Sequence, residues 1–387
     1  MDDNQQYLIE DEPIDRFLPN HLDPLLASCV SNSASDITIQ TNEKVTAEIF
    51  GCLYPITKRK LSKAEVGNLL NHIYGPNGTT QLSSGVDLDT YYEFRPSRID
   101  RHRFRVNATA CLVDGYEGIQ ITLRSIPSSP PSLNFMDLPK EILANVAPDD
   151  GAVYVTGSTG SGKSTLLAAI IRDIAEKVDS HRKILTYEAP IEFVYDDVKK
   201  HSCIISQSEI PRHIPTFADG VRNALRRKPR LILVGEARDQ ETINALLEAS
   251  LTGHPVYTTV HSNGVAETVR RLVNTFPQEE RNSKGIDIIE TMRLVIWQRL
   301  VPTVDGKRIP LREYLVFDEK VRNELLKVDI NKVSAATRMI VKRNKHTMLD
   351  DAKDKFKQGI LSKDTFEQIS RFSAGQDSDS ATVADSG

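Results

Sequence analysis

The stretch Gly157-Ser158-Thr159-Gly160-Ser161-Gly162-Lys163-Ser164 decides the fold of the larger part of this chain. It matches the pattern G-x-x-x-x-G-K-[ST] at every fixed position. A strand-like run at 152–156 precedes it, and a run of helical spacing at 165–178 follows it. Glycines let such a loop bend its backbone around phosphate groups, and the first amides of the helix point at them. The stretch therefore predicts a phosphate-binding loop between a strand and a helix.

The last residues of this loop carry its chemistry. We expect the Lys163 ammonium to bridge the β- and γ-phosphates of ATP and the Ser164 hydroxyl to bind Mg²⁺. ATP is therefore the predicted substrate, hydrolysed with Mg²⁺ as cofactor. The ATP-binding residues predicted in this stretch are Gly157, Ser158, Thr159, Gly160, Ser161, Gly162, Lys163, Ser164 and Thr165.

The pattern around the loop predicts an α/β fold. Short apolar runs alternate with segments of helical spacing, at residues 152–156, 184–187, 231–234 and 256–260. Such alternation is typical of a mostly parallel sheet with helices on both faces. From Pro277 to about Phe372 we expect helices, apart from a short strand at Val316-Phe317.

Carboxylates are expected at the edge of the sheet where ligands bind. Glu236 follows the apolar run Leu231–Val234, and Gly235 stands between them at a place where an Asp is usual. Glu236 therefore takes the predicted acidic role, holding the water shell of Mg²⁺, orienting the attacking water, or both. Glu188 ends another strand-like run and is our candidate for polarising that water. For Glu192 a catalytic and a structural role are equally open.

One histidine and several arginines complete the predicted site. His261 follows the run 256–260, where it would donate a hydrogen bond to the γ-phosphate, although a structural role also stays open. Phosphoryl transfer needs further positive charge, often from a neighbouring subunit. Arg101, Arg103 and Arg105 alternate and would share one face of a strand. The arginines predicted to contact ATP are Arg101, Arg105, Arg124 and Arg222.

Composition divides the chain into five parts. Short alternating strands and a helix that Ser62 would cap predict an α+β domain before the loop domain. A stretch with three prolines between Ser125 and Ser132 predicts a linker after it. The expected parts are a flexible arm at 1–20, the N-terminal domain at 21–124, the linker at 125–139, the ATPase domain with C-terminal helices at 140–372, and a disordered tail at 373–387.

Charge and hydropathy exclude some classes of function. The net charge of −4 shows no basic excess, so we expect no direct binding of nucleic acid. No apolar run approaches the ~20 residues of a membrane span, so membrane contact is expected to be peripheral or through a partner. The cysteines contain no CxxC pair and predict reduced thiols of a cytosolic protein.

Four motifs, in this order, resemble those of the secretion ATPases, the superfamily that contains the pilus motor PilT. They are the loop at 157–164, the acidic stretch Tyr187-Glu188-Ala189-Pro190-Ile191-Glu192-Phe193, the stretch Leu233-Val234-Gly235-Glu236-Ala237-Arg238-Asp239, and the histidine stretch at 252–261. Within the superfamily the chain is most similar to the ATPases of Dot/Icm type IVB secretion systems. The stretches that carry this second likeness are 34–41, 206–213 and 311–318.

The resemblance implies an architecture and a task. Each subunit of a homohexameric ring would pair a PAS-like N-terminal domain with a RecA-like C-terminal domain, and ATP would sit between the two. The ring would power a type IVB secretion system. It would be cytoplasmic and peripherally associated with the inner membrane, through a secretion-complex ATPase or inner-membrane channel proteins.

The resemblance also implies a role for single residues. Lys163 and Ser164 would bind phosphate and Mg²⁺. The two acidic motifs would supply a catalytic carboxylate, Glu188, and a Walker B acid, Glu236, while His261 would sense the γ-phosphate. From the N-terminal domain, the residues expected to approach ATP are Arg101, Arg105 and Arg124.

Other functions stay open at this point. A conjugative-transfer or pilus motor of the same superfamily would share the motifs. A RecA-like nucleic-acid helicase would show DNA-stimulated, salt-sensitive ATPase activity. A scaffold that binds ATP without turnover is the non-enzyme alternative, against which the carboxylates Glu188 and Glu236 argue.

Overall fold

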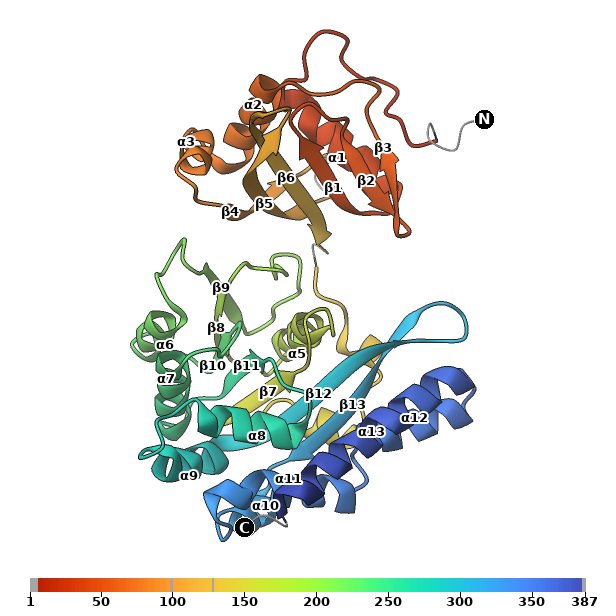
Figure 1. The fold of residues 1–387 in the computed structure, drawn as a ribbon. Helices are drawn as coiled ribbons and strands as arrows, with labels where there is room; N and C mark the ends of the chain where they lie inside the picture. Colours follow the sequence, from red (N-terminus) through yellow and green to blue (C-terminus); the bar gives the residue numbers. More distant parts are fainter. Residues whose placement is uncertain (1–5, 98–99, 127–128, 385–387) are drawn as a thin grey trace. The chain divides into compact units, whose positions relative to one another are not determined.

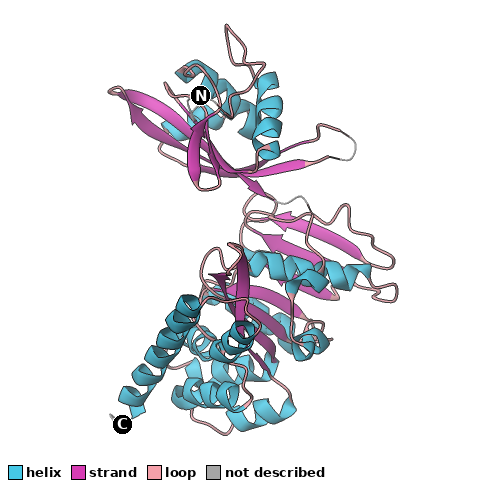
Figure 2. Cartoon of the chain, turned by 90° about the vertical axis from the view of Figure 1, so that its right-hand side faces the viewer, coloured by secondary structure: helices cyan, strands magenta, loops and turns pink. Residues whose placement is uncertain are grey.

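A computed structural model describes residues 6–97, 100–126 and 129–384 of the chain. The chain divides into two compact units, Met1–Ser128 and Ser129–Gly387. Figures 1 and 2 show both units as ribbons. In the part of the chain that the structure describes, no helix combines the length and the apolar character needed to cross a membrane.

The N-terminal unit is a six-stranded antiparallel sheet with the order β3-β2-β1-β6-β5-β4. Ile37 and Ile39 are fully buried against helices α1 and α2, whereas Thr38 and Gln40 between and beside them are not, which confirms the predicted alternation. The strands are β1 (Ala34–Gln40), β2 (Thr46–Ile49), β3 (Cys52–Pro55), β4 (Leu88–Phe94), β5 (His102–Val113) and β6 (Tyr116–Ile126). The helices are α1 (Leu22–Ser31), α2 (Lys63–Tyr74) and α3 (Gly78–Ser83).

Helix α2 begins as predicted, and its cap also holds the start of the chain. The Glu65 N–H donates to the Ser62 hydroxyl, and the Glu65 carboxylate accepts from the Ser62 N–H at 2.8 Å. The same carboxylate accepts from the Phe17 N–H at 2.6 Å, and the Phe17 ring is buried. Phe17 therefore anchors this part of the chain to the unit, although composition favours a flexible arm there. Burial of Phe17 is a tertiary contact, which composition does not reveal.

The second unit is built on a seven-stranded sheet with the order β13-β12-β7-β11-β10-β8-β9. All neighbouring strands are parallel except the antiparallel pair β12–β13. The strands are β7 (Ala152–Thr156), β8 (Lys183–Glu188), β9 (Ile204–Glu209), β10 (Leu231–Val234), β11 (Val256–Val260), β12 (Met292–Pro302) and β13 (Arg308–Val316). The four predicted strands are confirmed.

Helices cover both faces of this sheet, as the alternation predicts. One apolar core lies between one face of the sheet and α5 with residues 133–146. A second core lies between the other face and helices α6, α7, α8, α9 and α11. The helices are α4 (Lys140–Asn145), α5 (Lys163–Glu176), α6 (Phe217–Leu225), α7 (Gln240–Leu251), α8 (Val265–Asn274), α9 (Arg281–Thr291), α10 (Glu319–Leu325), α11 (Val333–Arg343), α12 (Met348–Lys357) and α13 (Lys363–Ala384).

Two segments differ from the sequence-based expectation. The long hairpin β12–β13 occupies part of the region expected to be helical, and of the predicted Val316-Phe317 strand only Val316 belongs to it. Residues 294–298 of β12 are all buried, so the polar–apolar alternation that reveals a half-buried strand is missing. The backbone of α13 is helical to Ala384, although composition favours disorder from residue 373.

The second half of the Pro/Ser-rich stretch lies on the ATPase unit. Residues 127–128 lie outside the described residues, and a short 3-10 turn forms at Leu133–Met136. Leu133 is buried in the core beside α5. The Pro130 carbonyl accepts a hydrogen bond of 2.7 Å from Arg172 on α5. This anchored segment, residues 129–139, is called the foot segment below.

Candidate functional site

The phosphate-loop sequence forms a tight turn between β7 and α5. Gly157, Gly160 and Gly162 have φ of +147°, +74° and +83°, a region that side chains with a Cβ rarely adopt. A Cβ on Gly157 would also lie 2.4 Å from the carbonyl oxygen of Gln298 on β12. The turn therefore requires glycine at these three positions, and close packing against β12 also requires it at Gly157.

Lys163 reaches back across the loop that precedes it. Its ammonium donates to the carbonyls of Gly157 and Ser158 at 3.0 and 2.8 Å. Burial lowers the pKa of Lys163, while the negative charges of Glu236 and Glu192 raise it. The lysine is thus held at the loop by neutral carbonyls, with two carboxylates near enough to act on it.

The remaining polar groups of the loop also suit the phosphates of a nucleotide. Among the described residues, the buried Ser161 hydroxyl has no hydrogen-bond partner. Ser164 and Thr165 lie half-buried in the first turn of α5, a helix of 14 residues whose N-terminus favours anions. An unpartnered hydroxyl, a helix N-terminus and an ammonium together form the donor set that a polyphosphate needs.

Glu236 and His261 meet at the carboxyl edge of the sheet. Glu236 follows β10 and His261 follows β11, and parallel strands end at the same edge. The His261 Nε2 lies 3.3 Å from one Glu236 oxygen, and the Arg238 guanidinium lies 2.6 Å from the other. Burial and then the positive charge of Lys163 lower the pKa of His261, which favours the neutral imidazole at neutral pH.

Glu188 ends β8, the strand beside β10. Its carboxylate accepts from the Thr186 hydroxyl at 2.6 Å and from the Gln207 amide at 3.2 Å. Gly235 packs directly on this residue, because a Cβ at Gly235 would lie 3.3 Å from the Glu188 Cα. This close approach leaves little room for a side chain at the place where an Asp is usual, and the ends of β8 and β10 lie side by side here.

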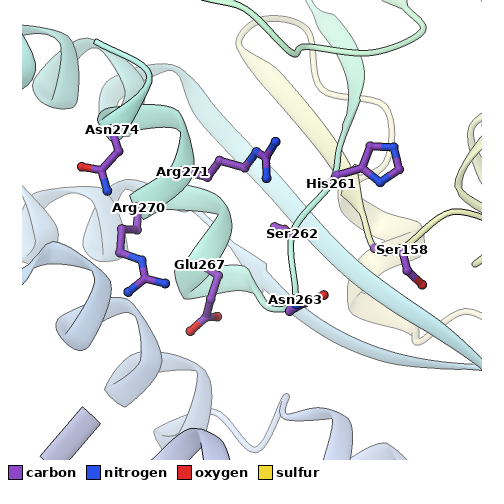
Figure 3. A pocket seen from close by; sticks show the side chains of 9 residues that line it. Ser158, His261, Ser262, Asn263, Glu267, Arg270, Arg271 and Asn274 are labelled. Carbon is purple, nitrogen blue, oxygen red and sulfur yellow. The ribbon is translucent and has the colours of Figure 1, made fainter. Parts of the chain in front are cut away.

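A cavity of about 670 Å³ opens beside the loop (Figure 3). Arg271 on α8 points from its wall toward His261, and its positive charge also lowers the pKa of His261. Its lining residues are Gly157, Ser158, His261, Ser262, Asn263, Glu267, Arg270, Arg271 and Asn274. Sequence reasoning missed the two α8 arginines, since no motif marks them and only the helix places them near the loop.

The predicted arginines of the N-terminal unit are held by carboxylates of that unit. Arg101 pairs with Glu93 at 2.8 Å, and Glu93 also lies 3.2 Å from the buried Arg103, which stacks on Tyr91. Arg105 and Arg124 also form ion pairs, with Asp89 at 2.9 Å and with Asp36 at 2.8 Å.

Arg222, the remaining predicted ATP ligand, lies on α6. It pairs with Asp219 at 3.2 Å and with Glu241 at 2.7 Å, on an exposed surface of the ATPase unit. Its described partners are thus acidic residues of α6 and α7 rather than residues of the phosphate loop.

The type II/IV secretion system protein family matches residues 10–308 of the chain, which is more than half of its length. The chain belongs to this family. The solved structure of the ATPase DotB from Legionella pneumophila is 62% identical, with a TM-score of 0.82 over 94% of this chain and 98% of that one. DotB from Yersinia pseudotuberculosis is 33% identical, with a TM-score of 0.79 and the same coverage.

A third solved structure is the pilus retraction motor PilT with bound ADP. It is 28% identical, with a TM-score of 0.77 over 89% of this chain and 95% of that chain. The chain is therefore a secretion ATPase of the kind that DotB and PilT represent, and the resemblance seen in its motifs is confirmed.

Proposed function

We propose that the chain is a Mg²⁺-dependent ATPase that works as a homohexameric ring and powers a type IVB, Dot/Icm-like secretion system. The observation that carries the proposal is that the Glu236–His261 pair lies near Lys163 of the phosphate loop. Similarity to DotB over nearly the whole chain supports the type IVB branch rather than a pilus or conjugation motor. The ring would act at the cytoplasmic face of the inner membrane, through partners in the secretion complex.

The phosphate loop would bind the ATP polyphosphate. Its amides and the Lys163 ammonium would take the β- and γ-phosphates, and the Ser164 hydroxyl together with Glu236, through water, would hold Mg²⁺. When bound, Mg²⁺ neutralises charge that develops on the phosphate oxygens. The described residues contain no cluster of three His, Cys, Asp or Glu side chains that could hold a metal, which suits an ion bound largely by phosphate and water.

The carboxyl edge of the sheet would handle the attacking water. Glu188, fixed by Thr186 and Gln207, would accept a hydrogen bond from that water and orient it. Neutral His261 would donate to the γ-phosphate from Nε2, the nitrogen that now faces Glu236. Exchange of a carboxylate for a phosphate at this N–H gives the site a way to sense whether the γ-phosphate is present.

Positive charge from the N-terminal unit would complete the site. Arg101, Arg105 and Arg124 are our candidates for this task, in the same or a neighbouring subunit. ATP moves the ring only if it binds one arrangement of the two units more tightly than the other. A site assembled from several parts meets this condition, because its affinity depends on how they are arranged.

The test measures phosphate release against protein concentration, with light scattering on the same samples. The wild type is compared with Glu236→Gln and with the control Glu279→Gln, whose side chain is exposed. We expect specific activity to rise as the mass reaches six subunits, and Glu236→Gln to assemble without turnover. Activity that is independent of concentration in a monomeric protein would remove the ring from the proposal.

A further inference from the structure

Two polar side chains are buried inside the β12–β13 hairpin. Gln298 on β12 is 2% exposed and Arg312 on β13 is 3% exposed. The two residues are direct partners in the strand register, and Arg312 Nε donates to the Gln298 side-chain oxygen at 3.4 Å. Burying an amide and a guanidinium costs free energy unless both find partners, so where their other bonds go is informative.

Gln298 contacts the phosphate loop with both its side chain and its backbone. Its amide nitrogen donates a buried hydrogen bond of 2.7 Å to the carbonyl of Ser161. Its own carbonyl lies where a Cβ on Gly157 would stand, 2.4 Å away, and its amide lies 3.1 Å from the corresponding point at Gly162. The start and the end of the loop therefore both pack against this one residue.

Arg312 contacts the foot segment. Its two terminal nitrogens donate to the carbonyls of Met136 and Asp137 at 2.7 and 2.9 Å. Lys355 on α12 lies 3.1 Å from the Asp137 carboxylate and closes the same cluster. Although burial lowers the pKa of Arg312 to about 10, the guanidinium stays charged at neutral pH and bonds strongly to carbonyls.

We propose that Gln298 and Arg312 are positioning residues that couple the phosphate loop to the foot segment, and through it to the stretch leading to the N-terminal unit. The proposal rests on the proposed function only in taking the loop as the nucleotide site. The chain of bonds is continuous, from Ser161 through Gln298 and Arg312 to Met136 and Asp137.

This chain of bonds makes the effect reciprocal. A nucleotide that fixes the Ser161 carbonyl fixes the Gln298 amide, which in turn orders Arg312 and the foot segment. By linkage, the factor by which a bound nucleotide favours the ordered foot segment equals the factor by which displacement of the foot segment weakens nucleotide binding.

Two substitutions break the chain of bonds at different places. Gln298→Glu keeps the size and an acceptor for Arg312 but loses the donor to Ser161 and places an oxygen against that carbonyl. Arg312→Lys keeps the charge but not the planar fork that spans two carbonyls and Gln298. The matched controls are Gln278→Glu and Arg308→Lys, whose side chains are exposed.

Hydrogen exchange of the full chain measures the coupling. We expect ADP to slow exchange of the amides at 133–138 in the wild type and in both controls. In Gln298→Glu and Arg312→Lys this slowing should be lost, while ADP still binds with an affinity lower by about tenfold. A KM for ATP that rises more than kcat falls would separate loop positioning from general damage to the fold.

Two results would overturn the coupling. One is a wild type that binds ADP with no change at 133–138, a comparison that needs no variant to fold. The other is unchanged ADP protection in both hairpin variants. A wild type that binds no ADP at all would instead defeat the nucleotide site itself, and with it the proposed function.

Discussion

The two units hold their basic side chains in different ways. In the ATPase unit, Lys163 donates to the carbonyls of its own loop and Arg312 to those of the foot segment. In the N-terminal unit, Arg101, Arg105 and Arg124 are bound to carboxylates. A carbonyl carries only a partial charge, whereas a carboxylate cancels a full one.

The difference concerns what each unit offers to an anion. The Lys163 ammonium is hydrogen-bonded to neutral carbonyls, which do not cancel its charge before a phosphate arrives. An N-terminal arginine that contacts ATP as proposed would first exchange its carboxylate for a phosphate. The ATPase unit is therefore organised for its ligand in advance, and the N-terminal unit would become so only through an exchange of partners.

The strongest way to break this comparison is Lys163→Ala. We expect phosphate release to fall by about 100-fold or more, because one donor aimed at developing charge in a site of this kind is worth that much. Lys177→Ala, directly after the last residue of the same helix, where the side chain is half exposed, should leave activity unchanged. Equal losses in both variants, measured by steady-state phosphate release, would contradict a special role for Lys163.

Arg124 tests the exchange of partners. Its side chain is 65% exposed, so Arg124→Ala should change the free energy of unfolding by less than about 1 kcal/mol. Activity of the assembled protein should nevertheless fall by about tenfold if the arginine contacts phosphate. Asp36→Asn, which frees Arg124 from its carboxylate, should keep or raise activity, and a loss equal to that of Arg124→Ala would refute the exchange.

Low pH should destabilise the N-terminal unit through Glu65. Burial raises the pKa of this carboxyl, but hydrogen bonds from Arg59, Phe17 and Ser62 outweigh burial and lower it from 4.5 to about 2. The stability that Glu65 contributes is therefore complete above pH 4.5 and is lost as pH falls toward 2, on the order of 1–3 kcal/mol. Amide exchange in β1 and α2 should show this loss in the wild type, and Glu65→Gln should show a flatter pH profile.

Glu313 in the ATPase unit should behave in the opposite sense. Burial raises its pKa from 4.5 to about 7, although the Val265 N–H donates to it at 2.8 Å. The folded protein therefore keeps a proton that the unfolded chain loses above pH 4.5, and stability falls as pH rises from 4.5 through 7.

The matching variant of Glu313 is Glu313→Gln, which stays neutral at every pH. It should stabilise the ATPase unit by on the order of 1 kcal/mol at pH 8 and have little effect at pH 5. Urea unfolding followed by circular dichroism at both pH values measures this. A variant that is equally destabilised at both would show that the carboxyl is ionised throughout.

What the sequence predicts well is local. The phosphate loop, its flanking elements and the Ser62 cap are specified by residues within a few positions of one another, and all are found where expected. The acidic and histidine motifs follow strands that end at one edge, so parallel topology alone brings Glu236 to His261.

What the sequence does not reveal depends on distant partners. Gln298 belongs to no motif, and its contact with Ser161 joins residues 137 positions apart. The β12–β13 hairpin is hidden because covered strands lose their alternation. The carboxylate partners of the N-terminal arginines likewise follow from strand pairing, as between Arg105 on β5 and Asp89 on β4, which a single sequence leaves open.

The hairpin has a practical consequence for optical work. The chain contains a single tryptophan, Trp297, and it lies beside Gln298 and pairs in register with Thr156, the last residue before the phosphate loop. Its ring is 6.1 Å from that of Phe372 on α13. The tryptophan emission of the native protein therefore comes from one place, where the phosphate loop, the β12–β13 hairpin and helix α13 meet. We expect nucleotide binding at the phosphate loop to change this emission in the unlabelled protein.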